Sequence, residues 1–287
     1  MSKILVFGAS GQLGSCLKKV AAERNISRMV FPEESSANIL DLDSLKSLFE
    51  EVRPSHVINC AAYTAVDRAE DDVETARKVN KDGAANLASF CDAYGSVLVH
   101  ISTDFVFKGD IPKLLSEDDL AEPVSVYGLT KLEGEQDIER LIKSFFIIRT
   151  SWLYSEFGNN FVKTMQRLGR ERDVLNVIVD QVGTPTYAID LAAAVLDIIE
   201  SGSEAYGIYH FSNEGAVSWY DFAEAIFEIS NIDVKLNPIP TSEYVTRAQR
   251  PPFSVMSKAK IKNVFGIKIS HWKKSLEACI ERLAETT

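Results

Sequence analysis

Short, mostly apolar runs alternate with helix-like stretches through the first half of the chain. Apolar runs of this length are typical of parallel strands that are covered on both faces. The runs lie at residues 4–7, 29–31, 57–60, 97–102 and 145–149, and the helical stretches lie at 12–24, 41–52, 72–94 and 125–141. This alternation predicts βαβ units, and therefore an α/β fold with a doubly wound parallel sheet of the Rossmann type.

The last third of the chain mixes helical, extended and proline-containing segments, with loops at 237–240 and 250–252. We interpret it as a second, smaller α/β domain that holds a substrate. An apolar helical stretch at 190–200 suggests that the chain returns to the first domain. We therefore predict a dinucleotide-binding domain over 1–150 plus 188–212, and a substrate domain over 151–187 plus 213–287.

The charge balance excludes some classes of partner. The formal net charge is -10, whereas a nucleic-acid binder needs a basic face for phosphates. The chain begins with a strand pattern rather than a signal peptide, and no apolar run reaches the ~18 residues of a membrane span. We expect a cytoplasmic protein with no nucleic-acid or membrane partner.

Cysteine and histidine are too scattered to suggest a metal site. No two cysteines form a CxxC pair, so reduced and mostly buried thiols are expected. The histidines also show no zinc-ligand spacing. The residues concerned are Cys16, Cys60, Cys91 and Cys279, and His56, His100, His210 and His271.

Three glycines follow the first strand directly. Gly8, Gly11 and Gly14 form G-x-x-G-x-x-G, one residue longer than the common dinucleotide fingerprint. Glycine permits a tight turn, close approach of the backbone to a pyrophosphate, and close packing of helix on strand. Because a helix starts here, its N-terminal N–H groups would face the phosphates. The alternative is a plain strand–helix turn.

The choice between NAD and NADP stays open. No basic residue lies between positions 31 and 40, and Glu33 and Glu34 follow the second strand, which favours NAD. Neither glutamate is clearly at the strand end, however, and Arg28 lies just upstream.

Tyr127 and Lys131 form a Y-x-x-x-K pair on a predicted helix. A spacing of four places both side chains on one helix face. Reduction of a ketone by hydride needs a proton donor, and tyrosine has an ordinary pKa of about 10. A nearby ammonium stabilises tyrosinate, so Lys131 would lower that pKa and could also hold the nicotinamide ribose. The alternative is a chance surface pair.

A hydroxyl directed at the carbonyl oxygen would complete such a site. Thr103 ends the strand at 97–102 and is our candidate, with Ser102 as the second choice. Doubly wound sheets bind ligands at the carboxyl ends of their strands.

These motifs together resemble the dTDP-4-dehydrorhamnose reductase family, within the extended short-chain dehydrogenases/reductases. The resemblance covers almost the whole chain and adds to the Tyr127/Lys131 pair several longer motifs. They are GASGQLG at 8–14, NCAAYTAVD at 59–67, STDFVF at 102–107, RTSWLY at 149–154, GNNF at 158–161, DQVGTPT at 180–186 and RP at 250–251.

The resemblance implies NADPH- or NADH-dependent reduction of the 4-keto group of dTDP-4-dehydro-L-rhamnose, the last step toward dTDP-L-rhamnose for surface polysaccharides. It implies Tyr127 as proton donor, Lys131 as cofactor anchor and Thr103 as carbonyl-side hydroxyl. The cofactor positions implied are Gly8, Ser10, Gly11, Gln12, Leu13, Gly14, Asp41, Leu42, Ala61, Ala62, Tyr63, Thr64, Tyr127 and Lys131.

The substrate positions are Thr103, Asp104, Trp152 and Arg250. Trp152 offers an apolar face for a sugar ring, or else is a core residue. Arg250 is suited to a substrate phosphate, or else forms an ordinary ion pair. The family often has Tyr where this chain has Phe105, which leaves the exact sugar open.

The resemblance allows a monomer or a homodimer, sometimes with Mg²⁺ at the dimer contact, but this sequence offers no clear metal cage. Two other functions remain open. One is a nucleotide-sugar epimerase or dehydratase, which recycles its cofactor. The other is a non-catalytic regulatory relative, against which the retention of Thr103, Tyr127 and Lys131 argues.

Overall fold

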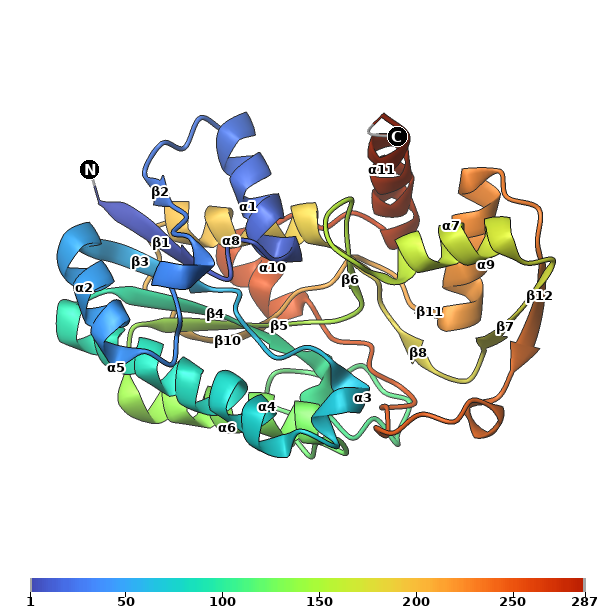
Figure 1. Ribbon diagram of the computed structural model, residues 1–287, viewed down its shortest axis with the longest axis horizontal. Helices are drawn as coiled ribbons and strands as arrows, with labels where there is room; N and C mark the ends of the chain where they lie inside the picture. The colour runs from blue at the N-terminus through green and yellow to red at the C-terminus, as the bar shows by residue number, and fades with distance from the viewer. Residues whose placement is uncertain (1, 286–287) are drawn as a thin grey trace.

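A six-stranded parallel sheet organises the protein, whose computed structural model describes residues 2–285 (Figure 1). The strand order is β10-β5-β4-β3-β1-β2, and every pairing between neighbours is parallel. The strands are β1 (Lys3–Phe7), β2 (Met29–Val30), β3 (Pro54–Asn59), β4 (Val97–Thr103), β5 (Phe145–Thr150) and β10 (Gly207–His210). The predicted doubly wound α/β sheet is confirmed.

Helices cover both faces of this sheet, which explains its apolar strands. In β1, Ile4 and Val6 face one core while Leu5 and Phe7 face the other, because side chains alternate along a strand. Figure 1 shows α1 (Gln12–Glu23) and α8 (Ala188–Glu200) on one face. The opposite face carries α2 (Leu42–Val52), α5 (Gly83–Tyr94) and α6 (Val126–Leu141).

The chain changes direction at β1. It passes from β1 to β2 on one side and then crosses to β3 on the other, so β1 lies between its two successors. Connections that leave in opposite directions open a crevice at the carboxyl ends of the strands. The loops after β1 and β3 therefore form the walls of the crevice.

The segment expected as one helix over 72–94 contains a π-helical turn. Helix α4 (Val73–Arg77) continues into η2 (Lys78–Asp82) and then α5. Within this turn, Asn80 accepts a hydrogen bond from the Tyr63 N–H at 2.8 Å and donates to Thr130 Oγ1 at 3.1 Å. The turn thus ties the loop after β3 to helix α6, consistent with the frequent occurrence of π-bulges at functional sites.

Smaller elements make up the rest of the chain. They include three two-stranded sheets, β12-β7 and β6-β9, which are parallel, and β11-β8, which is antiparallel. The elements are η1 (Glu34–Ser36), α3 (Val66–Ala69), η3 (Asp104–Val106), β6 (Leu153–Tyr154), α7 (Phe161–Glu171), β7 (Val174–Ile178), β8 (Val182–Gly183), β9 (Thr186–Tyr187), β11 (Val217–Ser218), α9 (Trp219–Ser230), β12 (Lys235–Ile239), η4 (Thr241–Glu243), α10 (Ala259–Phe265) and α11 (Trp272–Glu285). Within residues 2–285, each helix is too short or too polar to cross a lipid bilayer.

The C-terminal third touches the sheet at more than one point. Strand β10 pairs with β5, and α8 packs on α1, so the segment expected to return lies with the sheet. Helix α10, which falls in the predicted substrate domain, also reaches the sheet, because the Phe265 ring lies 5.8 Å from Phe146 of β5. The division into two domains therefore remains a prediction.

A buried ion pair joins α6 to the sheet. Glu135 of α6 is 1% exposed and Arg149 of β5 is 3% exposed. Arg149 Nη2 lies 2.6 Å from Glu135 Oε2, and the Ser102 hydroxyl of β4 also donates to this carboxylate. One carboxylate therefore links a helix to two strands.

Replacing Glu135 by Gln should lower the free energy of unfolding by about 3–5 kcal/mol, because Arg149 would keep a buried and uncompensated charge. Urea denaturation measures the loss. The matched control is Glu133→Gln on the same helix, which removes a partly exposed ion pair with Arg77 of α4 and should cost about 1 kcal/mol or less. Equal losses in the two variants would contradict the assigned importance of the buried pair.

Candidate active site

Two adjoining cavities lie over the carboxyl ends of the strands. The first, of about 530 Å³, is lined by the glycine loop, by residues after β2 and by residues after β3. The second, of about 640 Å³, is lined by residues after β3, β4 and β5 and by helix α6. Gly11, Cys60 and Ala62 line both cavities. The two cavities therefore form one continuous crevice at the point where the strand order reverses.

Two positions of the glycine loop leave no room for a side chain. Gly8 has a φ of +72°, and a Cβ there would lie 2.6 Å from the Ala61 nitrogen. A Cβ on Gly14 would lie 2.4 Å from the Gly8 carbonyl oxygen. Helix α1 begins after Gly11, and no side chain caps its N-terminus. These features suit a pyrophosphate bound against backbone N–H groups, as the sequence predicts.

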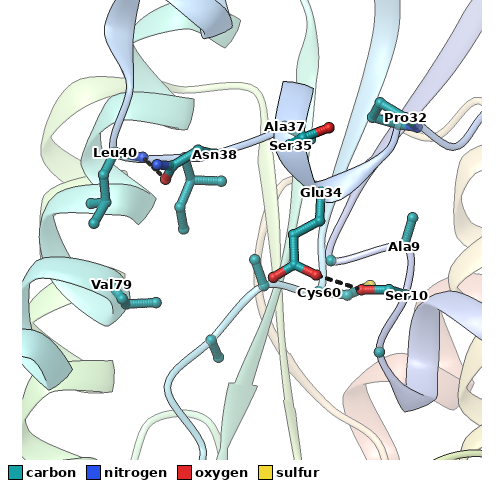
Figure 2. A pocket seen from close by; sticks show the side chains of 15 residues that line it. Ala9, Ser10, Pro32, Glu34, Ser35, Ala37, Asn38, Leu40, Cys60 and Val79 are labelled. Atoms are coloured by element: carbon teal, nitrogen blue, oxygen red, sulfur yellow. Dashed lines mark hydrogen bonds between the residues drawn. The ribbon is translucent and has the colours of Figure 1, made fainter.

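Figure 2 shows Glu34 projecting into the first cavity, between the glycine loop and the segment 38–40. The Ser10 hydroxyl donates to its carboxylate at 3.3 Å. Glu34 is the one charged residue among the described residues that line this cavity. Arg28, the basic residue considered above, lies outside that lining and reaches Ser2 instead.

The adenine positions implied by the resemblance fall beside the first cavity rather than in its wall. The Asp41 carboxylate caps α2 by accepting from the N–H groups of Asp43 and Ser44, and the Ser44 bonds lower the pKa of Asp41. Leu42 is 55% exposed. Ile39 and Leu40 line the cavity instead.

The loop after β3 lies between the two cavities. Ala61 and Ala62 line the first cavity, and Ala62 and Thr64 line the second. Tyr63 lies outside both linings, and its hydroxyl reaches Asp72 at 3.4 Å. Three of the four loop positions implied by the resemblance therefore line the crevice.

Tyr127 and Thr103 meet in the second cavity. Ser125 caps α6 by accepting from the Gly128 N–H, which places Tyr127 in the first turn. Burial raises the pKa of Tyr127 to about 12, nearby Asp104 raises it further, and a side-chain hydrogen bond with Thr103 opposes the rise. The Ser102 hydroxyl is occupied by Glu135, so Thr103 is the strand-end hydroxyl that contacts the phenol.

Asp104 adds a second proton-binding group beside this pair. It is 2% exposed, and its Oδ1 accepts from Thr103 Oγ1 at 3.1 Å. Burial raises the pKa of Asp104 to about 6, against the effect of hydrogen bonds from Ser254 and Thr103. Asp104 therefore exchanges its proton close to neutral pH, beside the phenol.

Lys131 is turned toward the sheet. Its Nζ donates to the Ile101 carbonyl oxygen at 2.7 Å and lies 3.0 Å from His100 Nε2. Burial lowers the pKa of Lys131 to about 8. We expected Lys131 to lower the pKa of Tyr127, but in this structure that pKa is raised, because burial of the phenol dominates. Sequence reasoning missed His100, which lies in an otherwise ordinary apolar strand.

Trp152 and Arg250 line the second cavity but already have partners. Trp152, at a φ of +46°, stacks on Trp219 with ring centroids 3.5 Å apart. Arg250 forms an ion pair with Asp67, its Nη2 lying 2.6 Å from Oδ2. Trp219 also lines the cavity and was missed, because an aromatic residue in a distant segment carries no local signal. One face of Trp152 and one edge of Arg250 are therefore occupied in this arrangement.

Phe105 supports the phenol from the side. Its ring meets Tyr127 edge to face, with centroids 5.6 Å apart and an interplanar angle of 73°.

Among residues 2–285, no group of three or more His, Cys, Asp or Glu side chains is arranged to hold a metal ion.

The parallel sheet, the glycine loop and the Tyr-x-x-x-Lys helix together define a nicotinamide-dependent oxidoreductase of the extended short-chain class. More narrowly, the chain belongs to the RmlD substrate binding domain family, whose model matches residues 2–285.

Individual relatives agree with this assignment. The chain is 40% identical to the dTDP-4-dehydrorhamnose reductase of Aggregatibacter actinomycetemcomitans, with 96% of this chain and 98% of the relative covered. It is similar to the crystal structure of a dTDP-4-dehydrorhamnose reductase from Clostridium acetobutylicum (TM-score 0.94, 42% identity, 98% and 99% covered). It is also similar to the Bacillus anthracis enzyme in complex with NADP (TM-score 0.93, 38% identity, 98% and 100% covered).

Proposed function

We propose that this protein is a dTDP-4-dehydrorhamnose reductase, which reduces the 4-keto group of dTDP-4-dehydro-L-rhamnose with NADH or NADPH in the cytoplasm. The contact between Tyr127 and Thr103 carries the proposal, because it sets two hydroxyls side by side in a cavity continuous with the glycine loop. Membership of the RmlD family supports the choice of sugar nucleotide.

The residues of the glycine loop would hold the cofactor, which supplies a hydride when bound. The glycines at 8 and 14 would let a pyrophosphate approach the backbone at the uncapped N-terminus of α1, and Ser10 and Glu34 would face the adjoining ribose in the first cavity. The crevice then leads to the second cavity, where Tyr127 and Lys131 lie. The glycine backbone, the hydroxyl and the carboxylate around the first cavity are the groups expected of a dinucleotide site.

Thr103 and Tyr127 act on the keto oxygen of the substrate. With a pKa of about 12, the phenol is protonated at neutral pH and holds the proton that the product alkoxide needs. The hydroxyl of Thr103, which donates to Asp104 in this structure, would rotate to donate to the same oxygen and stabilise the negative charge that develops on it. Asp104, Trp152 and Arg250, which line the same cavity, would contact the nucleotide sugar.

Tyr127→Phe should reduce kcat by about 10²- to 10⁴-fold while leaving the Kd of NADH or NADPH unchanged, because only the proton donor is lost. Turnover is followed by loss of NAD(P)H absorbance with dTDP-4-dehydrorhamnose. Tyr94→Phe, at the C-terminus of α5 beside Phe49, is the matched control. An unchanged rate in Tyr127→Phe would remove the phenol from the mechanism. Turnover without net NAD(P)H consumption would indicate an epimerase or dehydratase instead.

We further propose that NADH is the preferred cofactor. Glu34 projects into the first cavity, where the adenosine ribose of the cofactor would lie, and the described lining of this cavity has no basic residue. A 2′-phosphate there would meet a like charge, whereas ribose hydroxyls can donate to the carboxylate.

Glu34→Gln should improve NADPH binding relative to NADH by about fivefold, which corresponds to the ~1 kcal/mol of one like-charge pair in water. Cofactor Kd values from fluorescence titration provide the ratio. Glu33→Gln is the control, because it removes the neighbouring charge without touching the cavity lining. If both variants change the ratio equally, the preference does not come from Glu34.

A further inference from the structure

A buried chain of hydrogen bonds lies behind Lys131. Asn59 at the end of β3, His100 in β4 and Lys131 in α6 are each 1% exposed. Asn59 Nδ2 lies 3.0 Å from His100 Nδ1, and His100 Nε2 lies 3.0 Å from Lys131 Nζ. None of the longer motifs or the mechanism above explains the histidine.

The direction of every bond in this chain follows from its first member. The Ala61 N–H donates to Asn59 Oδ1 at 3.0 Å, so the amide must turn its Nδ2 toward His100. An amide nitrogen only donates, and therefore His100 Nδ1 must accept. Burial lowers the pKa of His100 well below its usual range, so the ring is neutral and carries its one hydrogen on Nε2.

The Nε2–H of His100 points at Lys131. A neutral amine has a lone pair that accepts this hydrogen while its own N–H groups donate to the Ile101 carbonyl oxygen. An ammonium group has no lone pair, so it would set two donors face to face. The observed position of Nζ is thus the position of the neutral amine.

Two other titratable groups face Lys131, and neither offers it a partner in this position. Glu135 from α6 favours the ammonium form, but its carboxylate is bonded to Arg149 and Ser102. Cys60 after β3 would favour it as a thiolate, but burial raises the pKa of Cys60 to about 12 and keeps the thiol neutral. The protonated side chain therefore finds its nearest open space in the second cavity, which Lys131 lines.

We propose that Asn59 and His100 are positioning residues that form a two-position switch for Lys131. The Nε2–H of His100 holds the neutral amine against β4, and the ammonium form turns into the second cavity toward Tyr127. The purpose of the switch rests on the proposed function, in which the ammonium form of Lys131 anchors the cofactor and stabilises the tyrosinate form of Tyr127. Its hydrogen-bond geometry can be measured without substrate or cofactor.

The affinity for NADH should therefore depend on pH in a defined direction. The bound state favours the protonated lysine, so affinity is complete below the Lys131 pKa of about 8 and falls as the pH rises above it. The fall approaches tenfold per pH unit, as expected for one linked proton.

The decisive experiment measures the tautomer of His100 by ¹⁵N NMR on the cofactor-free protein. We expect the hydrogen on Nε2 in the unmodified chain. In Asn59→Asp the carboxylate should pull the hydrogen to Nδ1, so that Nε2 accepts from the ammonium of Lys131. The ¹³Cε signal of Lys131 should titrate near pH 8 in the unmodified chain. In Asn59→Asp it should titrate above the ordinary lysine pKa of about 10.4.

The exposed Asn176→Asp is the matched control and should change neither signal. A hydrogen on Nδ1 in the unmodified chain overturns the proposal, and this result needs no variant to fold. A reversed tautomer in Asn59→Asp with an unshifted Lys131 titration also overturns it. If the tautomer and titration behave as expected but the protein does not reduce the nucleotide sugar, the proposed function fails and the switch stands.

Discussion

The contact between the glycine loop and the loop after β3 is the constraint on which the rest of the structure depends. The backbone of Gly8 lies so close to Cys60 and Ala61 that no side chain fits between them. This contact closes the floor of the crevice where the strand order reverses. It also places the N-terminus of α1 beside the loop that ends at Thr64, so the two cavities share a wall.

Helix α6 carries three polar side chains on one face. Tyr127, Lys131 and Glu135 are spaced by four residues, and each meets a different environment. The phenol faces the second cavity, the amine faces the backbone of β4, and the carboxylate is buried against Arg149. A single helix thus carries the proposed proton donor, the proposed cofactor anchor and the carboxylate that attaches it to the sheet.

Some residues of the site could be predicted from the sequence and others could not. Glycine spacing and the Tyr127/Lys131 pair are local patterns within one turn or one helix, so their positions on the fold could be predicted. Trp152 could be marked as a cavity residue, but not its stack on Trp219, which comes from a helix 67 positions later. Asp41 and Leu42, the adenine positions implied by the resemblance, lie beside the first cavity, and Ile39 and Leu40 form its wall.

The amino-acid sequence by itself determined the alternation of strands and helices, the place of the glycine turn and the helical spacing of Tyr127 and Lys131. These depend on spacing along a few consecutive residues. Only the tertiary structure decided which groups surround them. Asn59 and His100 are 41 positions apart, and His100 and Lys131 are 31 apart. Their shared hydrogen bonds exist because β3, β4 and α6 pack together, and the protonation of a buried group depends on such neighbours rather than on its own segment.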